Sequence, residues 1–374
     1  MTDRVPAEVF PPGEFLRDEL EARNWTQTEF AEIIRRPPRL VNEVIAGKRG
    51  ISPDTAREFS AALGTSAQFW LNLETAYQLS KTGPVSEHIS REARLRGKFP
   101  VREMVKRRWV ETSENFEVLE QRVLNFYELE SIDDEVRFSH AARRNHAETL
   151  SDIQLAWLFR VRQLALTLTV PQYSKKLLIS ALSELEKLME SPEETRHVPR
   201  ILAESGVRLV IVEPVSGSKI EGVCFWVNNN RAPVIGLSLR FGRIDNFWFN
   251  LRHEIEHVLN GNGKSGYIVD DTEVLSGASD QPDAERIANE AAADFCVPTQ
   301  KMSDFVNRLD PMYSRANLVG FARLMERHPG IVAGQLQRRI DRWDLFKKFQ
   351  VDIRQALVQS ALTDGYGQSV PAMA

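Results

Sequence analysis

The sequence predicts a mostly helical α+β protein with several domains. Apolar residues recur at helical spacing over most of the chain. Three short segments, at 207–214, 222–228 and 233–239, are instead rich in valine, isoleucine and aromatic residues and are bounded by turn residues. They predict a small three-stranded sheet packed on helices. At roughly 150 residues per domain, the 374 residues correspond to two or three domains.

Composition places the chain among globular proteins. Hydrophobic residues make up 42% of it and charged residues 27%, which excludes the disordered and collagen-like classes. No apolar run approaches the ~18 residues that a membrane helix needs, and the N-terminus lacks the basic and apolar segments of a secretory signal. The two cysteines, Cys224 and Cys296, are far apart, which excludes a disulfide framework. We therefore expect a cytoplasmic protein with no membrane partner.

Changes in sequence texture divide the chain into four segments. Short helical stretches with turn signals come first, longer helices follow, and strand-like segments begin after Gly206. We expect a five-helix domain at 1–82, a helical middle at 83–205, a domain of sheet and helices at 206–345, and a C-terminal helix with a flexible tail at 346–374.

The first domain carries clear helix start and stop signals. Thr26 followed by Glu29 is a capping-box pattern, Ser52 is a second N-cap signal, and Gly64 marks a helix end. The predicted helices cover 13–23, 27–34, 39–46, 54–63 and 66–79.

The second and third of these helices have the pattern of a helix-turn-helix, in which a short exposed helix enters the major groove of DNA. Between residues 35 and 49 there are five basic residues and one acidic residue, although residues 1–80 carry a net charge of -3. We assign Arg39 and Asn42 to base edges, and Arg36, Lys48 and Arg49 to phosphates. The alternative is a helical bundle with an ordinary basic corner.

A second basic stretch begins the helical middle. Residues 91–108 contain eight Lys or Arg and two Glu. A solvated helical face explains such a run first, and further phosphate contacts are the alternative.

Residues 12–79 resemble the Cro/C1-type domain of HigA-family antitoxins. The resemblance rests on GEFLRDELEARNWTQTEFA, VNEVIAGKRGIS and TAREFSAALGTSAQFWLNLE. It implies double-stranded DNA as a partner and a cognate toxin as a possible one. Pro37 and Pro38 depart from the small polar turn usual in that family, so the resemblance implies the fold but does not fix the register of the base contacts. Because one such domain usually binds tightly only when paired on a palindromic operator, we expect a homodimer.

The strongest chemical signal is the segment His253-Glu254-Ile255-Glu256-His257. Residues four apart lie on one face of a helix, so His253 and His257 can both bind one tetrahedral metal ion. Glu254 is then placed to act as a general base without being a ligand. The alternative is that the histidines are core residues and that Glu254 and Glu256 belong to a solvated face.

A catalytic zinc site needs a third protein ligand, for which Glu273, Glu285 and Glu290 are the downstream candidates. We favour Glu285, because it shares a helical face with small alanines that let two helices approach closely. Asn289, one turn further on, is a candidate for a hydrogen bond to a ligand.

Two further residues, Tyr267 and His328, are candidates for stabilising the negative charge that develops on a peptide carbonyl. For both, a packing or surface role is the alternative.

The segment HEIEH, preceded by PVIGLSL and followed by E-x-x-A-N-x-x-A-x-x-F-x-x-P from Glu285 to Pro298, resembles the ImmA/IrrE zinc metallopeptidases. HPGIVAGQLQ at 328–337 also matches that family. Together with the HigA-like part, the resemblance covers about 12–345. It implies a zincin-like fold at 206–345, a Zn²⁺ cofactor, and cleavage of a repressor or partner protein in stress or mobile-element regulation.

The sequence therefore predicts a DNA-binding transcriptional regulator fused to a zinc-dependent endopeptidase that cleaves a repressor, a cognate toxin or itself. The alternative is an antitoxin-like autorepressor whose peptidase-like domain is a non-catalytic sensor or docking module.

Overall fold

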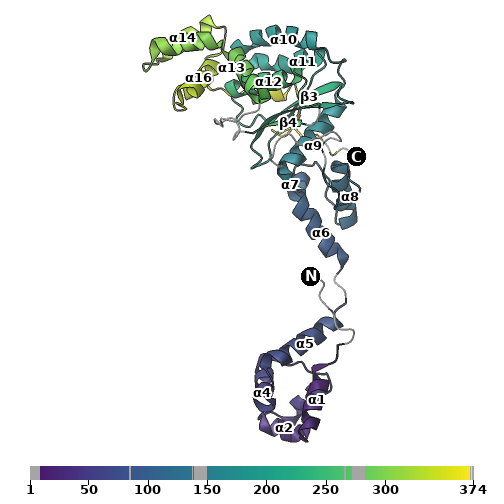
Figure 1. The fold of residues 1–374 in the computed structure, drawn as a ribbon. Helices are drawn as coiled ribbons and strands as arrows, with labels where there is room; N and C mark the ends of the chain where they lie inside the picture. Colours follow the sequence, from purple (N-terminus) through teal and green to yellow (C-terminus); the bar gives the residue numbers. More distant parts are fainter. Residues whose placement is uncertain are drawn as a thin grey trace. The chain divides into compact units, whose positions relative to one another are not determined.

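The computed structural model describes residues 9–83, 86–136, 138, 150–264, 267–271, 283–370 and 372. The chain divides into two compact units, Met1–Ile89 and Ser90–Ala374, which are drawn in Figure 1. Within the described ranges, no helix has the length and apolar character needed to cross a membrane.

The first unit contains the five predicted helices, each within two residues of its predicted ends. They are α1 Pro12–Ala22, α2 Gln27–Ile33, α3 Pro38–Ile45, α4 Pro53–Leu63 and α5 Ala67–Lys81. The Thr26 and Glu29 side chains form the reciprocal capping box, and Ser52 accepts a hydrogen bond from the Thr55 N–H. Gly64 ends α4 in the left-handed conformation. These local signals were therefore interpreted correctly.

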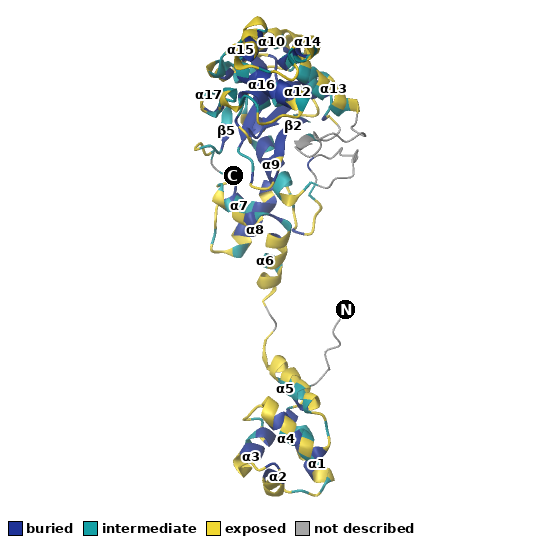
Figure 2. Cartoon of the chain, turned by 90° about the vertical axis from the view of Figure 1, so that its left-hand side faces the viewer, coloured by how far each residue is buried: buried dark blue, intermediate teal, exposed yellow. Residues whose placement is uncertain are grey.

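Aromatic residues hold the helices of this unit together. The Phe59 ring lies 5.3 Å from the ring of Phe30 and 5.4 Å from that of Trp70, and all three side chains are fully buried. The buried faces of the helices point into the unit, and the exposed faces point outward (Figure 2). Leu40, Val41, Val44 and Ile45 of α3 belong to the same buried core, so α3 also packs against the other helices of this unit.

The second unit is built on a five-stranded sheet with the strand order β4-β2-β3-β1-β5. The three predicted strands are present as β1 Arg208–Val212, β2 Ile220–Val227 and β3 Ala232–Leu237. The predicted strand number was too low, because two short edge strands, β4 Tyr267–Asp271 and β5 Leu362–Asp364, extend the sheet. β5 has only three residues, too few for a visible period-2 pattern, whereas β4 is as long as β1 and was not identified from its sequence.

Helices cover both faces of the sheet. Helix α9 (Asp152–Thr167) contributes to the core on one face, and α12 (Ile244–Leu259) to the core on the other. The remaining helices in the described ranges are α6 Glu87–Lys98, α7 Val101–Lys106, α8 Phe116–Phe126, α10 Lys175–Lys187, α11 Val198–Glu204, α13 Asp283–Cys296, α14 Thr299–Leu309, α15 Arg315–Leu324, α16 Pro329–Ile340 and α17 Arg354–Val358. Turns of 3-10 helix lie at Leu188–Glu190, Pro192–His197 and Lys347–Phe349.

The predicted helical middle does not form a core of its own. Trp157 and Val161 of α9 share one hydrophobic cluster with Val210 and Val223 of the sheet. The run Ala156–Val161 is buried without interruption, so this part of α9 is surrounded by other elements. The change from helical to strand-like sequence at Gly206 is thus a change of secondary structure inside one unit.

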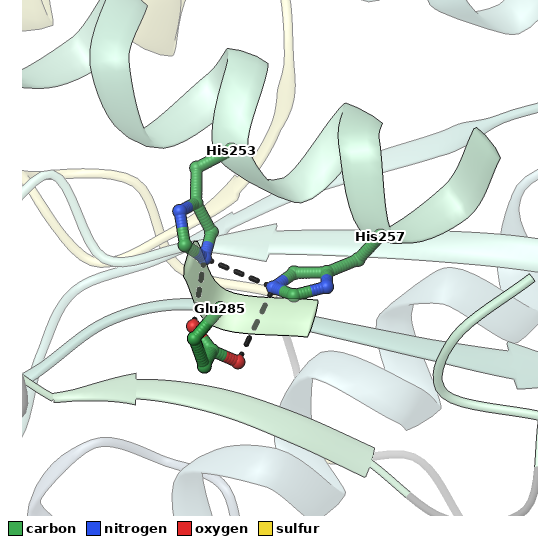
Figure 3. Close-up of side chains that lie close together, drawn as sticks. All are labelled: His253, His257 and Glu285. Atoms are coloured by element: carbon green, nitrogen blue, oxygen red, sulfur yellow. Dashed lines mark hydrogen bonds and ion pairs between the residues drawn. The ribbon is translucent and has the colours of Figure 1, made fainter. Parts of the chain in front are cut away.

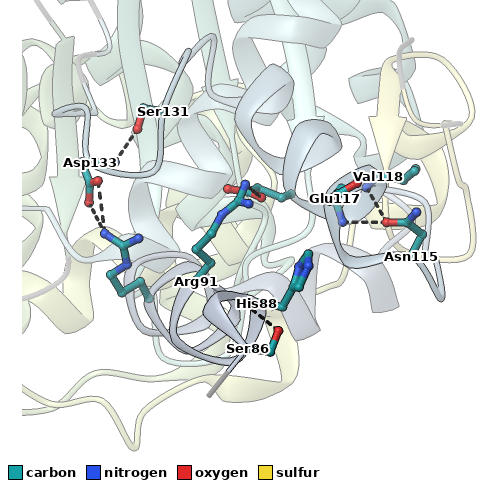
Figure 4. Close-up of polar contacts among 10 residues, drawn as sticks. Ser86, His88, Arg91, Asn115, Glu117, Val118, Ser131 and Asp133 are labelled. Carbon is teal, nitrogen blue, oxygen red and sulfur yellow. Dashed lines mark hydrogen bonds and ion pairs between the residues drawn. The ribbon is translucent and has the colours of Figure 1, made fainter. Parts of the chain in front are cut away.

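The basic stretch at 91–108 mainly anchors α6 and α7 within the unit. Arg91 pairs with Glu120 and Arg94 with Asp133, and Figure 4 shows Arg91 and Asp133 among these contacts. The Lys98 ammonium donates to the Ile132 carbonyl at 2.6 Å. This supports the interpretation as an ordinary protein surface rather than as a set of phosphate contacts.

The C-terminal segment differs from the predicted flexible tail. Asp364 in β5 pairs with the fully buried Arg160 of α9, which also donates to the Val370 carbonyl. The Tyr366 N–H donates to the Glu213 carboxylate at 2.8 Å. The tail prediction was wrong up to Val370, because a buried guanidinium in a distant helix satisfies its hydrogen bonds with this segment.

Candidate metal centre and nucleic-acid interface

Helix α12 presents the two histidines of the HEIEH segment to the interior. Its apolar residues, including Trp248, Leu251 and Ile255, are buried in the core on one face of the sheet. His253 and His257 are almost completely buried one turn apart. The packing of α12 in the core therefore determines where the two imidazole rings lie.

Helix α13 brings the third ligand candidate to the pair. Ala288 and Ala292 are completely buried, as expected for two helices that approach closely. The Glu285 Oε2 atom lies 3.2 Å from His253 Nε2, and Oε1 lies 3.4 Å from His257 Nε2. Figure 3 shows the carboxylate below the two rings, facing both of them. The structure thus unites the three residues predicted as ligands.

Asn289 also takes the position that its spacing predicted. Its Oδ1 atom lies 3.1 Å from His253 Nδ1. Because Oδ1 can only accept, the proton of a neutral His253 is placed on Nδ1, and Nε2 is left with a lone pair. That lone pair points toward Glu285 and His257, which is the orientation a metal ligand needs.

The Glu285 carboxyl group is held as an anion. Burial raises the pKa of Glu285, but in metal-free protein the His253 and His257 imidazoles that carry a proton on Nε2 donate hydrogen bonds to it, and these outweigh burial and bring the pKa down to about 2. The carboxylate therefore supplies a negative charge inside an otherwise enclosed cluster.

The donor set fits zinc. The ligand atoms of His253, His257 and Glu285 all lie within 4.8 Å of one another. Two imidazole nitrogens and one carboxylate oxygen form a common protein ligand set of catalytic zinc sites, in which the fourth position stays open. Cysteine-rich ligand sets are absent from the described part of the chain, where Cys224 and Cys296 are buried apart from this cluster.

Glu254 is fully buried, and its side chain lies against β2. A methyl group on Gly222 would come within 2.2 Å of the Glu254 Oε1 atom. One turn earlier on α12, Asn250 donates to the Glu221 carboxylate at 2.8 Å. The sequence analysis did not identify the close approach of Glu254 to Gly222, although a glycine in a strand is a known signal that another group comes close to the backbone.

The other predicted site residues lie elsewhere or are not described. His328 is the N-cap of α16, where Nδ1 accepts from the Gly330 N–H at 3.0 Å, so it serves the helix rather than the cluster. Glu290 is exposed and pairs with Arg286, as expected for a solvated residue. The Tyr267 side chain and the whole of Glu273 fall outside the described residues.

In the first unit, α3 has the two faces of a recognition helix. Leu40, Val41 and Val44 are buried, whereas Arg39 and Asn42 point outward. The Arg39 side chain is 87% exposed and pairs with Glu43 on its own helix. Such an exposed pair is easily exchanged for a nucleic-acid contact, because it contributes little in water.

The predicted phosphate contacts differ in their freedom. Arg36 forms a bidentate hydrogen bond with Glu58, which ties it to α4. Arg49 pairs with Glu43 at 3.2 Å, and Lys48 is exposed. A phosphate would have to compete with Glu58 for Arg36. Lys48 is therefore more available for a phosphate contact than Arg36 is.

Known proteins are similar to the first unit. A model of the helix-turn-helix family matches residues 16–70. The uncharacterised HTH-type transcriptional regulator YddM of Escherichia coli is 31% identical over 84 residues, or 22% of this chain and 88% of that protein. The structure of PA4674 of Pseudomonas aeruginosa in complex with its operator DNA is 34% identical, with a TM-score of 0.20, and the match covers 20% of this chain and 87% of that one. The antitoxin HigA of P. aeruginosa with the higBA promoter is 31% identical, with a TM-score of 0.19, over 21% of this chain and 99% of that one.

These matches and the fold of the first unit define a class. The chain belongs to the helix-turn-helix family of DNA-binding transcriptional regulators. Within that class it is similar to HigA-type antitoxins.

Proposed function

We propose that this transcriptional regulator is also a zinc-dependent endopeptidase that acts in the cytoplasm on a repressor or another partner protein. The observation that carries the proposal is the convergence of His253, His257 and Glu285 into one buried cluster. The likeness of HEIEH and of the Glu285 segment to the ImmA/IrrE metallopeptidases gives further support.

The chain's own residues have distinct roles in this proposal. His253, His257 and Glu285 would hold the zinc ion, and Asn289 fixes the ring of His253. Bound there, zinc supplies Lewis-acid polarisation of the peptide carbonyl. Glu254 accepts a proton from the attacking water at a carboxylate oxygen and delivers it to the leaving amine.

The first unit gives the proposal its regulatory side. We infer that α3 enters the major groove of a palindromic operator and that two chains bind as a homodimer. Arg39 and Asn42 read base edges, while Lys48 and Arg49 contact phosphates. The exposure of Arg39, Asn42 and Lys48 supports this assignment.

A second candidate function follows from the burial of Glu254, which is 0% exposed. A carboxylate without solvent exposure is poorly placed to activate water, so this burial favours a metal-binding module that senses or docks without cutting. The protein would then be an antitoxin-like autorepressor.

The two functions are separated by incubating the zinc-loaded full chain with a proteome-derived peptide library and identifying the new N-termini. The peptidase predicts reproducible cleavage that falls by a factor of roughly 10² to 10⁴ in Glu254→Gln, with zinc retained. Glu290→Gln, an exposed glutamate of α13, is the matched control and should cleave normally. Absence of cleavage by the zinc-loaded wild type, together with intact operator binding, would establish the non-catalytic alternative.

A further inference from the structure

The strand beside the HEIEH helix contains an extra residue. Ile220 of β2 pairs with Asp271, whereas Gly222 pairs with Asp270, so Glu221 is additional relative to β4. In a regular strand, consecutive residues face opposite sides of the sheet. A β-bulge interrupts that alternation and redirects side chains, and bulges are common next to active sites.

As a result, two consecutive residues of β2 face α12. The Glu221 carboxylate accepts a hydrogen bond from Asn250 at 2.8 Å. At Gly222, an added methyl group would lie 2.2 Å from Glu254 Oε1 and 3.0 Å from its carboxyl carbon. Asn250 and Glu254 are four residues apart on α12, so the bulge meets two successive turns of the helix.

The contact at Gly222 is specific for the base. The three atoms nearest to an added methyl group all belong to Glu254, and the metal-ligand candidates are not among them. Carbon and oxygen atoms in ordinary contact lie about 3.5 Å apart, so any side chain at this position would displace the carboxylate by about 1 Å. The Glu254 carboxylate thus packs directly against the backbone of Gly222, in the space that a side chain at this position would occupy.

Position matters more for a general base than for a packing residue. A misplacement of about 1 Å in a catalytic group can lower the rate by about 100-fold. The flexible glutamate side chain must therefore be confined on several sides. The close approach of β2 confines it on the side of the sheet.

We propose that Gly222, presented by the bulge at Glu221, is the positioning residue of Glu254. This inference rests on the proposed peptidase function. It assigns Gly222 no contact with zinc or substrate: it acts through the place and orientation of the Glu254 carboxylate.

The first test compares zinc-loaded Gly222→Ala with the wild type, using the peptide that the wild type cleaves best from the proteome-derived library. We expect unchanged zinc content, a KM within about twofold, and a kcat lower by about 100-fold. Gly320→Ala is the control, because a methyl group there meets no described atom within 4 Å. An unchanged kcat in Gly222→Ala would overturn the proposal.

A double variant separates this effect from a general loss of structure. Glu254→Asp shortens the side chain by one methylene, which moves its carboxylate away from Gly222, and it lowers kcat by itself. Because both substitutions act on the same carboxylate, the loss of kcat in Gly222→Ala combined with Glu254→Asp should be at least about tenfold smaller than the product of the two single losses. A loss equal to that product would contradict the proposal.

Two readouts do not depend on cleavage. In metal-free protein, Gly222→Ala should lower the melting temperature when Glu254 is present, and much less in a Glu254→Ala background. With Co²⁺ in the site, the pH midpoint of its visible spectrum should shift in Gly222→Ala and stay unchanged in Gly320→Ala. Equal melting losses in both backgrounds, or an unshifted midpoint, would refute the inference. If the wild type cleaves nothing, the peptidase proposal fails, whereas these two measurements still decide the role of Gly222.

Discussion

The Nε2 atoms of His253 and His257 lie 2.9 Å apart, and both rings are buried. Helical spacing alone does not bring them so close, because side chains four residues apart begin about 6 Å from each other. The rings are inclined at 74° so that their nitrogens converge on Glu285. Two lone pairs at this distance repel each other unless a proton or a cation lies between them. The pair is therefore arranged to share a positive charge.

Asn289 should control how tightly this pair binds metal. Asn289→Ala removes the acceptor that keeps the His253 proton on Nδ1, so we expect zinc affinity to fall by a factor of roughly 10 to 100. Competition with a chromophoric chelator measures this loss. Asn289→Asp retains an acceptor and should stay near the wild-type affinity, and an Asn289→Ala variant with unchanged affinity would show that the hydrogen bond has no such role.

His328 should make stability depend on pH. Its Nδ1 atom caps α16 by accepting from Gly330, which requires the unprotonated atom. Burial lowers the pKa of His328 below its usual value, and Glu193 only partly opposes this shift. Because the folded pKa is the lower one, the contribution is complete above the unfolded pKa of about 6.5 and is lost as the pH falls through the folded value.

The comparison with His328→Asn isolates this effect, since asparagine is a good N-cap and does not titrate. We expect the melting temperature of the wild type to fall relative to that of His328→Asn as the pH is lowered from neutral to mildly acidic. Zinc release in acid affects both proteins alike. A difference that is constant with pH would rule out His328 as the titrating cap.

Arg39 should read bases, whereas the basic stretch of the second unit should not contact DNA. For a duplex selected from a random library, we expect Arg39→Ala to weaken binding by about 1 to 3 kcal/mol and to leave a scrambled duplex almost unaffected. Arg102→Ala removes an exposed cation that forms no ion pair among the described residues, and should change neither affinity. Fluorescence anisotropy measures both. Equal weakening for the two duplexes would reassign Arg39 to a phosphate.

The sequence predicted those features that depend on neighbouring residues. The capping box at Thr26 and the helix end at Gly64 need only a few adjacent positions, and they set the helices of the first unit. The convergence of His253, His257 and Glu285 was also predictable, because the two histidines share one helical face and Glu285 stands beside small alanines in a second helix.

Features that depend on distant contacts could not be predicted in this way. The strand β5 has three residues and exists through its pairing with β1 and the buried Arg160. The contact of Gly222 with Glu254 depends on a β-bulge in β2, and the pairing of β2 with β4 sets the position of that bulge. The local sequence of β5 does not identify β1 or α9 as its partners, and the local sequence of β2 does not identify β4 or α12.

The Arg160 and Asp364 pair should be important for the stability of the second unit. Removing one partner leaves the other charge buried, so Asp364→Ala should lower the free energy of unfolding by about 3 to 5 kcal/mol. The exposed pair of Arg200 with Glu204 provides a control, and Glu204→Ala should cost less than about 1 kcal/mol. Denaturant unfolding measures both. Similar losses in the two variants would contradict the importance of burial for the first pair.

The proposed function depends on one zinc ion held by His253, His257 and Glu285. The most direct measurement is the zinc content of purified full-length protein, with X-ray absorption at the zinc edge to identify its ligands. We predict about one zinc per chain, bound by two imidazole nitrogens and a carboxylate oxygen, and loss of that zinc in Glu285→Ala but not in Glu290→Gln. A wild-type protein that binds no zinc after exposure to it, or a Glu285→Ala variant that keeps the same ligands, would contradict the claim.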